Sequence, residues 1–162
     1  MKWIEPEEYY ASIPQKRVAA GALFFDENNR VLLVETSYKG WSIPGGVADA
    51  EESPRDACVR EVKEEIDIPV AAKDLILLSV AHITPSKKES WKGDSLQFVF
   101  DGGVLDKDMI NNIALDNEEI INFAFIEKEK ITTHLTKGIC QRVLDALQVK
   151  YQGGDAYFDY DM

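Results

Sequence analysis

Apolar residues gather in short runs along the chain, and most runs have the length of a β-strand in a globular protein. They contain many β-branched and aromatic residues and are bounded by polar, turn-forming ones. The turn cluster DENN separates the first two runs, which predicts an antiparallel hairpin. A further short extended segment at residues 41–46 enters a loop. We predict strands at residues 17–25, 30–37, 75–83, 95–102 and 120–126.

A different spacing of apolar residues marks a helix at residues 53–66. Ser53 is a good N-cap, and Pro54 suits the first helical position. The same kind of spacing predicts an amphipathic helix at residues 134–148, and residues 5–11 are expected to form a short N-terminal helix. The apolar residues that recur every four positions in the first of these helices, and so form its buried stripe, are Cys58, Val62 and Ile66.

Strands and helices follow one another without a strict βαβ alternation. We therefore expect an α+β fold in which a mixed β-sheet is sandwiched between helices. A chain of 162 residues can bury the core of one domain, and we predict a single domain over residues 1–162. Residues 150–162 form a polar tail with several aromatic residues. The sequence leaves open whether this tail docks on the domain itself, docks on a second subunit of a homodimer, or stays disordered. Its aromatic residues are Tyr151, Tyr157, Phe158 and Tyr160.

The charge balance narrows the choice of partners. The chain has 29 acidic and 18 basic residues and a formal net charge of −11. This disfavours binding to a nucleic-acid polymer or to an anionic membrane, both of which need a basic surface. A small phosphate-bearing substrate is compatible with it, because a bound cation reverses the local charge. We also see no membrane-spanning run and no signal-peptide pattern, and two cysteines suggest free thiols, so we expect a cytoplasmic protein.

One helix face carries an unusual concentration of acid. Glu61, Glu64 and Glu65 lie within about one turn of each other, and like charges at this spacing cost roughly 0.2–0.5 kcal/mol per pair in an isolated helix. A solvated acidic surface is the plain interpretation. The alternative interpretation is a binding site for a hard divalent cation such as Mg²⁺, because such a cation binds carboxylate oxygens and would relieve their repulsion.

The loop before this helix, together with the helix, resembles the Nudix box. The family pattern places glycine, glutamate, an Arg-Glu pair, a Glu-Glu pair, glycine and apolar residues at fixed spacing. The preceding Trp41, Pro44 and Gly45 also fit the family. Only Asp67 departs, standing where the family has glycine. The matching positions in this chain are Gly46, Glu52, Arg60, Glu61, Val62, Glu64, Glu65, Asp67 and Ile68.

The resemblance implies a Nudix fold and hydrolysis of a diphosphate bond in a nucleoside diphosphate linked to another moiety. It implies a divalent metal, Mg²⁺ with Mn²⁺ as a substitute, bound by Glu61 and Glu65 with support from Glu64. The backbone carbonyl of Gly45 matches a further ligand of the family. Arg60 and Glu52 match a pair that orients the box through a salt bridge.

Other site residues are less strongly indicated. Relatives take the catalytic base from the box or from a later loop, where Glu118 and Glu119 are the candidates and Glu119 is favoured. Lys39, Lys87 and Trp91 are candidates for substrate contacts, with ordinary solvated residues as the alternative. His82 lies inside an apolar strand and is interpreted as structural.

Two further hypotheses come from the same resemblance. A Nudix-fold binding or sensor module without turnover usually lacks box glutamates, and this chain keeps all of them. A prenyl diphosphate isomerase on the same fold needs a catalytic cysteine, and Cys58 is expected in the core.

Asp67 should adopt the left-handed conformation that the family's glycine adopts, at a cost on the order of 1 kcal/mol.

Overall fold

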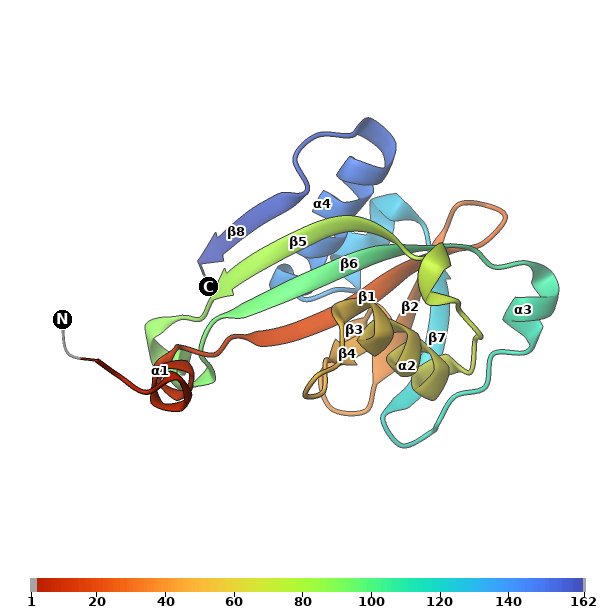
Figure 1. Cartoon of the computed structure of the whole chain (residues 1–162). Coiled ribbons are helices and arrows are strands. Elements are labelled where there is room, and N and C mark those ends of the chain that lie inside the picture. The colour runs from red at the N-terminus through yellow and green to blue at the C-terminus, as the bar shows by residue number, and fades with distance from the viewer. Residues whose placement is uncertain (1–2, 162) are drawn as a thin grey trace.

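The centre of the computed structural model, which describes residues 3–161, is a mixed β-sheet with long helices on both faces (Figure 1). This is the α+β arrangement expected from the sequence. The sheet has the path β3-β2-β1-β6-β5-β8, with β4 paired to β1 and β7 paired to β2. The strands are β1 (Arg17–Phe25), β2 (Val31–Thr36), β3 (Gly40–Ser42), β4 (Gly45–Val47), β5 (Ile76–Thr84), β6 (Ser95–Val104), β7 (Ile120–Ile126) and β8 (Tyr157–Asp161).

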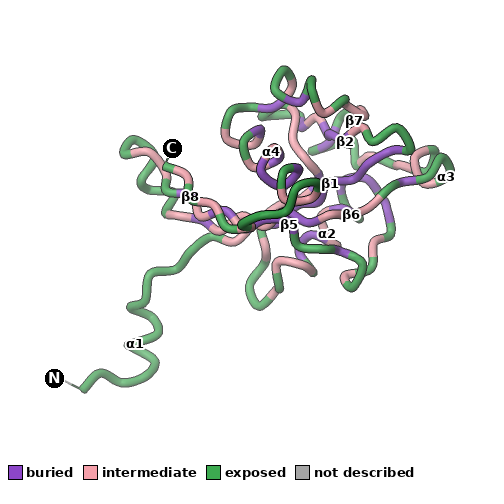
Figure 2. Tube along the Cα trace, turned by 90° about the horizontal axis from the view of Figure 1, so that it is seen from above, coloured by how far each residue is buried: buried purple, intermediate pink, exposed green. Residues whose placement is uncertain are grey.

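The helices vary in length and in what they cover. The short α1 lies apart from the body of the molecule, and all of its residues are exposed (Figure 2). No helix within residues 3–161 combines the length and apolarity needed to cross a membrane. The α-helices are α1 (Pro6–Ser12), α2 (Pro54–Ile66), α3 (Lys107–Asn111) and α4 (Lys137–Gln152), and the short 3₁₀ helices are η1 (Ala72–Asp74), η2 (Lys87–Lys92) and η3 (Lys128–Thr133).

The predicted hairpin is present, but its strands stay together only near the turn. β1 and β2 are antiparallel, with Phe25 opposite Val31. Further along, β1 pairs with β4 instead, and Ala20 lies opposite Gly46. On its other edge β1 runs parallel to β6. The start of the box-like segment is therefore built directly onto the central strand of the sheet.

The two faces of the sheet bury two separate apolar clusters. Because side chains alternate along a strand, neighbouring residues of β1 face opposite helices. Phe24 packs in the cluster under α2, whereas Leu23 packs in the cluster under α4. The predicted stripe of α2 is confirmed, since Cys58, Val62 and Ile66 are all fully buried. Burial of this stripe fixes the rotation of α2 and thus the direction of its acidic face.

Both ends of α2 follow from local chemistry. The Ser53 hydroxyl oxygen accepts the Asp56 backbone N–H at 3.1 Å, and the hydroxyl donates to the Asp56 carboxylate at 2.6 Å. At the other end, Asp67 has φ 56° and ψ 27°. The expected left-handed conformation of Asp67 is therefore confirmed.

The C-terminal prediction needs correction. The last helix begins at Lys137 and ends at Gln152, a few residues later at each end than predicted. His134 lies in the turn before the helix, where its ring contacts Trp41 edge-to-face at 6.0 Å between centroids. The helix continues until Gly153 adopts a positive φ of 73°. Residues 150–152 thus belong to α4 and not to a tail.

Residues 157–161 of the predicted tail form the strand β8 at the edge of the same sheet. β8 runs parallel to β5, with Val80 opposite Tyr157. His82 of β5 contacts Asp159 of β8 at 3.2 Å and Asp94 at 3.0 Å through its two ring nitrogens. The structural role expected for His82 is in keeping with these contacts.

Candidate active site

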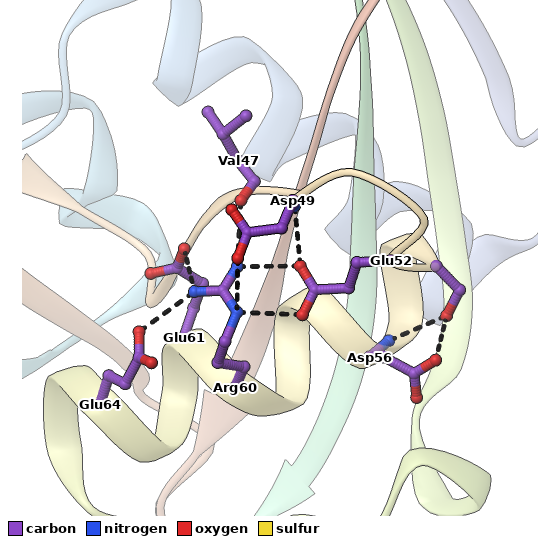
Figure 3. A network of polar contacts seen from close by, with 8 residues as sticks. Val47, Asp49, Glu52, Asp56, Arg60, Glu61 and Glu64 are labelled. Atoms are coloured by element: carbon purple, nitrogen blue, oxygen red, sulfur yellow. Dashed lines mark hydrogen bonds and ion pairs between the residues drawn. The ribbon is translucent and has the colours of Figure 1, made fainter.

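Arg60 is the centre of a polar network between α2 and the loop before it (Figure 3). Its Nε and one terminal nitrogen each donate to a different oxygen of Glu52, both at 2.9 Å. The predicted Arg60–Glu52 ion pair is therefore present, and it has the bidentate geometry that makes such pairs strong. The same terminal nitrogen donates to the backbone carbonyl of Val47 at 3.1 Å, which fixes the loop to the helix.

The other terminal nitrogen of Arg60 holds two of the three glutamates. It donates to Glu61 at 2.9 Å and to Glu64 at 3.1 Å. The surrounding carboxylates, Glu52 first, raise the pKa of Arg60 above its ordinary value. Arg60 therefore partly neutralises the acidic face, and this explains how the helix tolerates Glu61 beside Glu64.

Glu65 lies apart from this network and is buried. Only 6% of its surface is exposed, and one carboxylate oxygen accepts the backbone N–H of Gly45 at 2.9 Å. Burial raises the pKa of Glu65 to about 8, and the charges of Glu61 and Glu119 add to this effect. A carboxylate with one hydrogen bond and two acidic neighbours is costly to bury unless it is protonated or a cation joins it.

Two glycines let β4 approach the carboxylates. A Cβ on Gly46 would lie 2.4 Å from the carboxyl carbon of Glu61, so any side chain there would displace Glu61. Gly45 has φ +140°, and a Cβ there would lie 2.2 Å from the backbone oxygen of Ala20. The close packing of β4 between β1 and α2 therefore requires glycine at both positions.

The donor set fits a divalent cation, although the ligands are not yet converged. Within residues 3–161, no three acidic, histidine or cysteine side chains are arranged as a formed metal site. The reason is visible in the network, since Arg60 draws Glu61 and Glu64 toward itself. Burial also raises the pKa of Glu61. Burial is the largest cause of the raised pKa of both Glu61 and Glu65, and a bound cation would offset this cost. All the donors are the oxygens that Mg²⁺ and Mn²⁺ prefer.

The later loop brings one of its two glutamates next to this site. The Tyr38 hydroxyl donates to the Glu119 carboxylate, and this bond raises the pKa of Tyr38 to about 12. The Asp116 side chain accepts backbone N–H groups across the loop, including that of Glu119 at 3.2 Å. Glu119 contributes to the raised pKa values of both Glu61 and Glu65, whereas Glu118 contributes to neither.

The predicted substrate-contact residues are not all in one place. Lys39 lines a cavity of about 420 Å³ that reaches Gly45 and Gly46, together with Lys92. Lys87 and Trp91 lie in η2 and line neither this cavity nor a second, adjoining cavity of about 470 Å³. Trp91 is 79% exposed, and Lys92 lies over its ring.

Several residues of this region were not singled out from the sequence. Tyr38 and Asp116 hold Glu119, while Arg17 and Arg142 line the cavity. None belongs to the box, and the residues come from separate parts of the chain. A motif search has no signal for them, because only the fold brings them to the site.

Comparison with known proteins identifies the family of the chain. The family model described as the NUDIX domain matches residues 15–144. The chain therefore belongs to the Nudix hydrolase family, as the resemblance of the box predicted.

Individual relatives match over shorter stretches. The chain is 44% identical over 61 residues to the m7GpppN-mRNA hydrolase of Saccharomyces cerevisiae, covering 36% of this chain and 6% of the yeast protein. It is 36% identical over 75 residues to the 8-oxo-dGTP diphosphatase of Proteus vulgaris, covering 43% of this chain and 65% of that enzyme. The chain thus spans less than two thirds of either relative.

Among solved structures, the MutT protein of Methanosarcina mazei has the same fold. The two superpose with a TM-score of 0.67 at 22% identity, over 87% of this chain and 99% of the other. At this identity the likeness concerns the fold, and the prediction of a Nudix fold is confirmed.

Proposed function

We propose that this protein hydrolyses a diphosphate bond in a small nucleoside diphosphate derivative with the help of a divalent cation, Mg²⁺ or Mn²⁺. The observation that carries the proposal is the buried Glu65 beside Glu61, two carboxylates whose pKa values are raised chiefly by burial. The family to which the chain belongs, and the name diphosphatase of its Proteus relative, support the reaction class.

The residues that would hold the cation are Glu61, Glu65 and Glu64, together with the backbone carbonyl of Gly45. When bound, it would supply the positive charge that stabilises the phosphoryl oxygens as negative charge develops on them. Arg60 and Glu52 hold the helix and the loop together. Glu61 and Glu64, which pair with Arg60 in the structure, would turn their carboxylates to the cation when it is bound.

Glu119 is proposed as the base that takes a proton from the attacking water. Its carboxylate is exposed, lies next to the acidic pair, and is held in position by the Tyr38 hydroxyl. The loop that carries it is tied to β2 by the Ser37 N–H, which donates to the Glu119 carbonyl at 2.8 Å. These contacts favour Glu119 over Glu118, whose side chain has no such anchor.

The cysteines contribute no chemistry to this proposal. Cys58 is fully buried, and burial, with a smaller effect from Glu65 and Glu61, raises its pKa to about 12. A thiol in this state is neither accessible nor ionised, which argues against an isomerase that needs a catalytic cysteine. Both Cys58 and Cys140 are free and buried, which suits the reducing cytoplasm that we propose as its location.

The test is a substrate panel with metal-stripped protein. Nucleotide sugars, dinucleoside polyphosphates, ADP-ribose and oxidised nucleoside triphosphates would be incubated with and without Mg²⁺ or Mn²⁺. We expect hydrolysis of at least one class on addition of metal and its loss in excess chelator. Turnover that persists after thorough metal removal would refute the mechanism. Binding of a panel member without turnover under any metal condition would instead identify a sensor module.

A further inference from the structure

Two adjoining cavities, of about 420 and 470 Å³, lie between α4 and the sheet. Both are lined by Ile139 and Arg142 of α4 and by Arg17 of β1. One end reaches Gly46, whose opposite side contacts Glu61. The two cavities share these residues and form one groove, which begins at Gly45 and Gly46, the glycines of β4 whose other side lies against Glu65 and Glu61.

This groove is basic although the chain as a whole is strongly acidic. Five cationic side chains line it, and the only carboxylate among its lining residues is Glu89. Glu89 already pairs with one of the five, Lys92. The cationic residues are Arg17, Lys39, Lys92, Lys137 and Arg142. A concentration of positive charge in a protein of net charge −11 indicates a site for an anion.

Arg142 gives the most specific indication. It is half-buried, and its guanidinium makes no hydrogen bond or ion pair within residues 3–161. Burial consequently lowers its pKa. The nearby Asp145 is occupied, because it accepts hydrogen bonds from Gln141 at 3.0 Å and from the hydroxyl of Tyr160. A partly desolvated guanidinium without an acceptor is unfavourable, and a bound oxyanion would correct this.

Arg17 lies on the same groove and is also free to bind. It is the first residue of β1, and its side chain makes no ion pair or hydrogen bond in the described part of the chain. Ala20 of the same strand pairs with Gly46, so Arg17 lies about 10 Å along β1 from the catalytic end, at about 3.3 Å per residue. The backbone of Arg17 therefore lies beyond the span of one diphosphate, whose two phosphorus atoms share a single bridging oxygen.

We propose that Arg142 and Arg17 bind a second phosphate group of the substrate, separate from the diphosphate that is cleaved. Planar guanidinium groups bind phosphate oxygens in a bidentate manner and are less strongly hydrated than lysine, so they suit a partly buried phosphate site. This inference rests on the proposed function and extends it. The substrate is a nucleoside diphosphate derivative with an additional phosphate ester.

The test compares substrates that differ by one anionic group. Suitable pairs are coenzyme A with dephospho-coenzyme A, NADPH with NADH, and UDP-glucuronate with UDP-glucose. In at least one of the first two pairs, the phosphate-bearing member should have a kcat/KM about tenfold higher or more, mainly through a lower KM. Arg142→Gln and Arg17→Gln should each reduce that preference, with less than a threefold effect on the other member.

Three results would overturn the inference. They are the absence of any preference for the added phosphate, a preference that both variants keep, and a preference confined to the carboxylate of UDP-glucuronate. A binding measurement separates this failure from a failure of the proposed function. Without metal, adenosine 3′,5′-bisphosphate should bind more tightly than AMP, and Arg142→Gln should remove the difference even if no substrate is hydrolysed.

A thermal melt excludes a merely structural role for Arg142. Because its guanidinium has no protein partner, Arg142→Gln should leave the Tm of the ligand-free protein unchanged or raise it. Arg55→Gln is the matched control, since Arg55 donates to the backbone carbonyls of Leu75 at 2.8 Å and of Ala72 at 3.2 Å. Arg55→Gln should lower the Tm. An equal loss in Arg142→Gln would show that Arg142 is structural and would overturn the proposal.

Discussion

The two long helices, α2 and α4, pack against opposite faces of one sheet (Figure 2). The groups that we assign to function are acidic on α2 and basic on α4. α2 presents Glu61, Glu64 and Glu65, and α4 contributes Arg142 to the groove. The acidic side has an internal counter-charge in Arg60, whereas Arg142 has none in the described chain. The acidic side is thus held in part by a counter-charge within the protein, whereas on the basic side we propose that a phosphate group of the substrate supplies the counter-charge.

The two sides also differ in how they are encoded. The acidic face comes from one helical turn, so its spacing is visible in the sequence. The basic groove combines Arg17, Lys39, Lys92, Lys137 and Arg142, most of which lie far apart along the chain. Residues of the acidic face can therefore be substituted one at a time without disturbing the basic groove.

The largest effect is expected from Glu65→Gln, which keeps the size of the side chain and removes its charge. If Glu65 binds the cation, turnover should fall a hundredfold or more, about 2.7 kcal/mol at about 1.36 kcal/mol per decade. Turnover would be measured on whichever substrate the panel identifies. Near-normal activity would show that the acidic face is only a solvated surface.

The same variant makes a prediction for stability without metal. Since burial raises the pKa of Glu65 from 4.5 to about 8, the folded protein retains a proton that the unfolded chain loses between these values. The free energy of unfolding of the metal-free protein should therefore decrease as pH rises from about 5 to about 8. Glu65→Gln should flatten this slope, and equal slopes in the two proteins would contradict the burial argument.

The next largest effect is expected from Glu119→Gln, and it distinguishes between the two candidate catalytic bases. Glu119→Gln should lower kcat by roughly a hundredfold, within the range for a general base. Glu118→Gln is the matched control and should stay within about twofold of wild type, given that only Glu119 is anchored by Tyr38. The reverse order would make Glu118 the base, and near-normal activity in both variants would move the base to the box itself.

A smaller effect is expected from Gly46→Ala. The added methyl group would lie 2.4 Å from the carboxyl carbon of Glu61 and would push that flexible side chain away. Activity should drop about tenfold, while stability should change by only about 1 kcal/mol, since the neighbour that must move is a side chain. A full-activity variant would show that the position of Glu61 is not critical.

The smallest effect concerns the end of α2. Asp67→Gly should raise the free energy of unfolding by up to about 1 kcal/mol, because glycine adopts the left-handed conformation without a Cβ penalty. Asp67→Asn, which tolerates that conformation but cannot pair with Lys63, measures the contribution of the exposed ion pair. Activity should remain within a few-fold of wild type in both. A large fall in Tm for Asp67→Gly would reveal a further role for the carboxylate.

The sequence predicted those features that depend on neighbouring residues. The Ser53 cap, the buried stripe through Cys58 and the left-handed Asp67 are set within one helix, and each is present. The Arg60–Glu52 pair was readable from the family pattern of the box.

Features that depend on distant pairing were not predictable. β8 forms because it pairs with β5 from more than seventy positions away, and its short, half-exposed pattern carries no strong signal of its own. Tyr38 reaches Glu119 only because β2 and β7 are neighbours in the sheet. The groove likewise requires α4 to pack over β1 and β6, which no local motif specifies.

Calorimetric titration of the metal-free protein with Mn²⁺ tests the central claim, that the α2 carboxylates bind the catalytic cation. In buffers of different ionisation enthalpy, wild type should bind Mn²⁺ at pH 7 and release a proton, because burial holds Glu65 largely protonated with a pKa of about 8. Glu65→Gln should bind at least tenfold more weakly and release no proton from this site. Equal affinity and equal proton release in the two proteins would contradict the account.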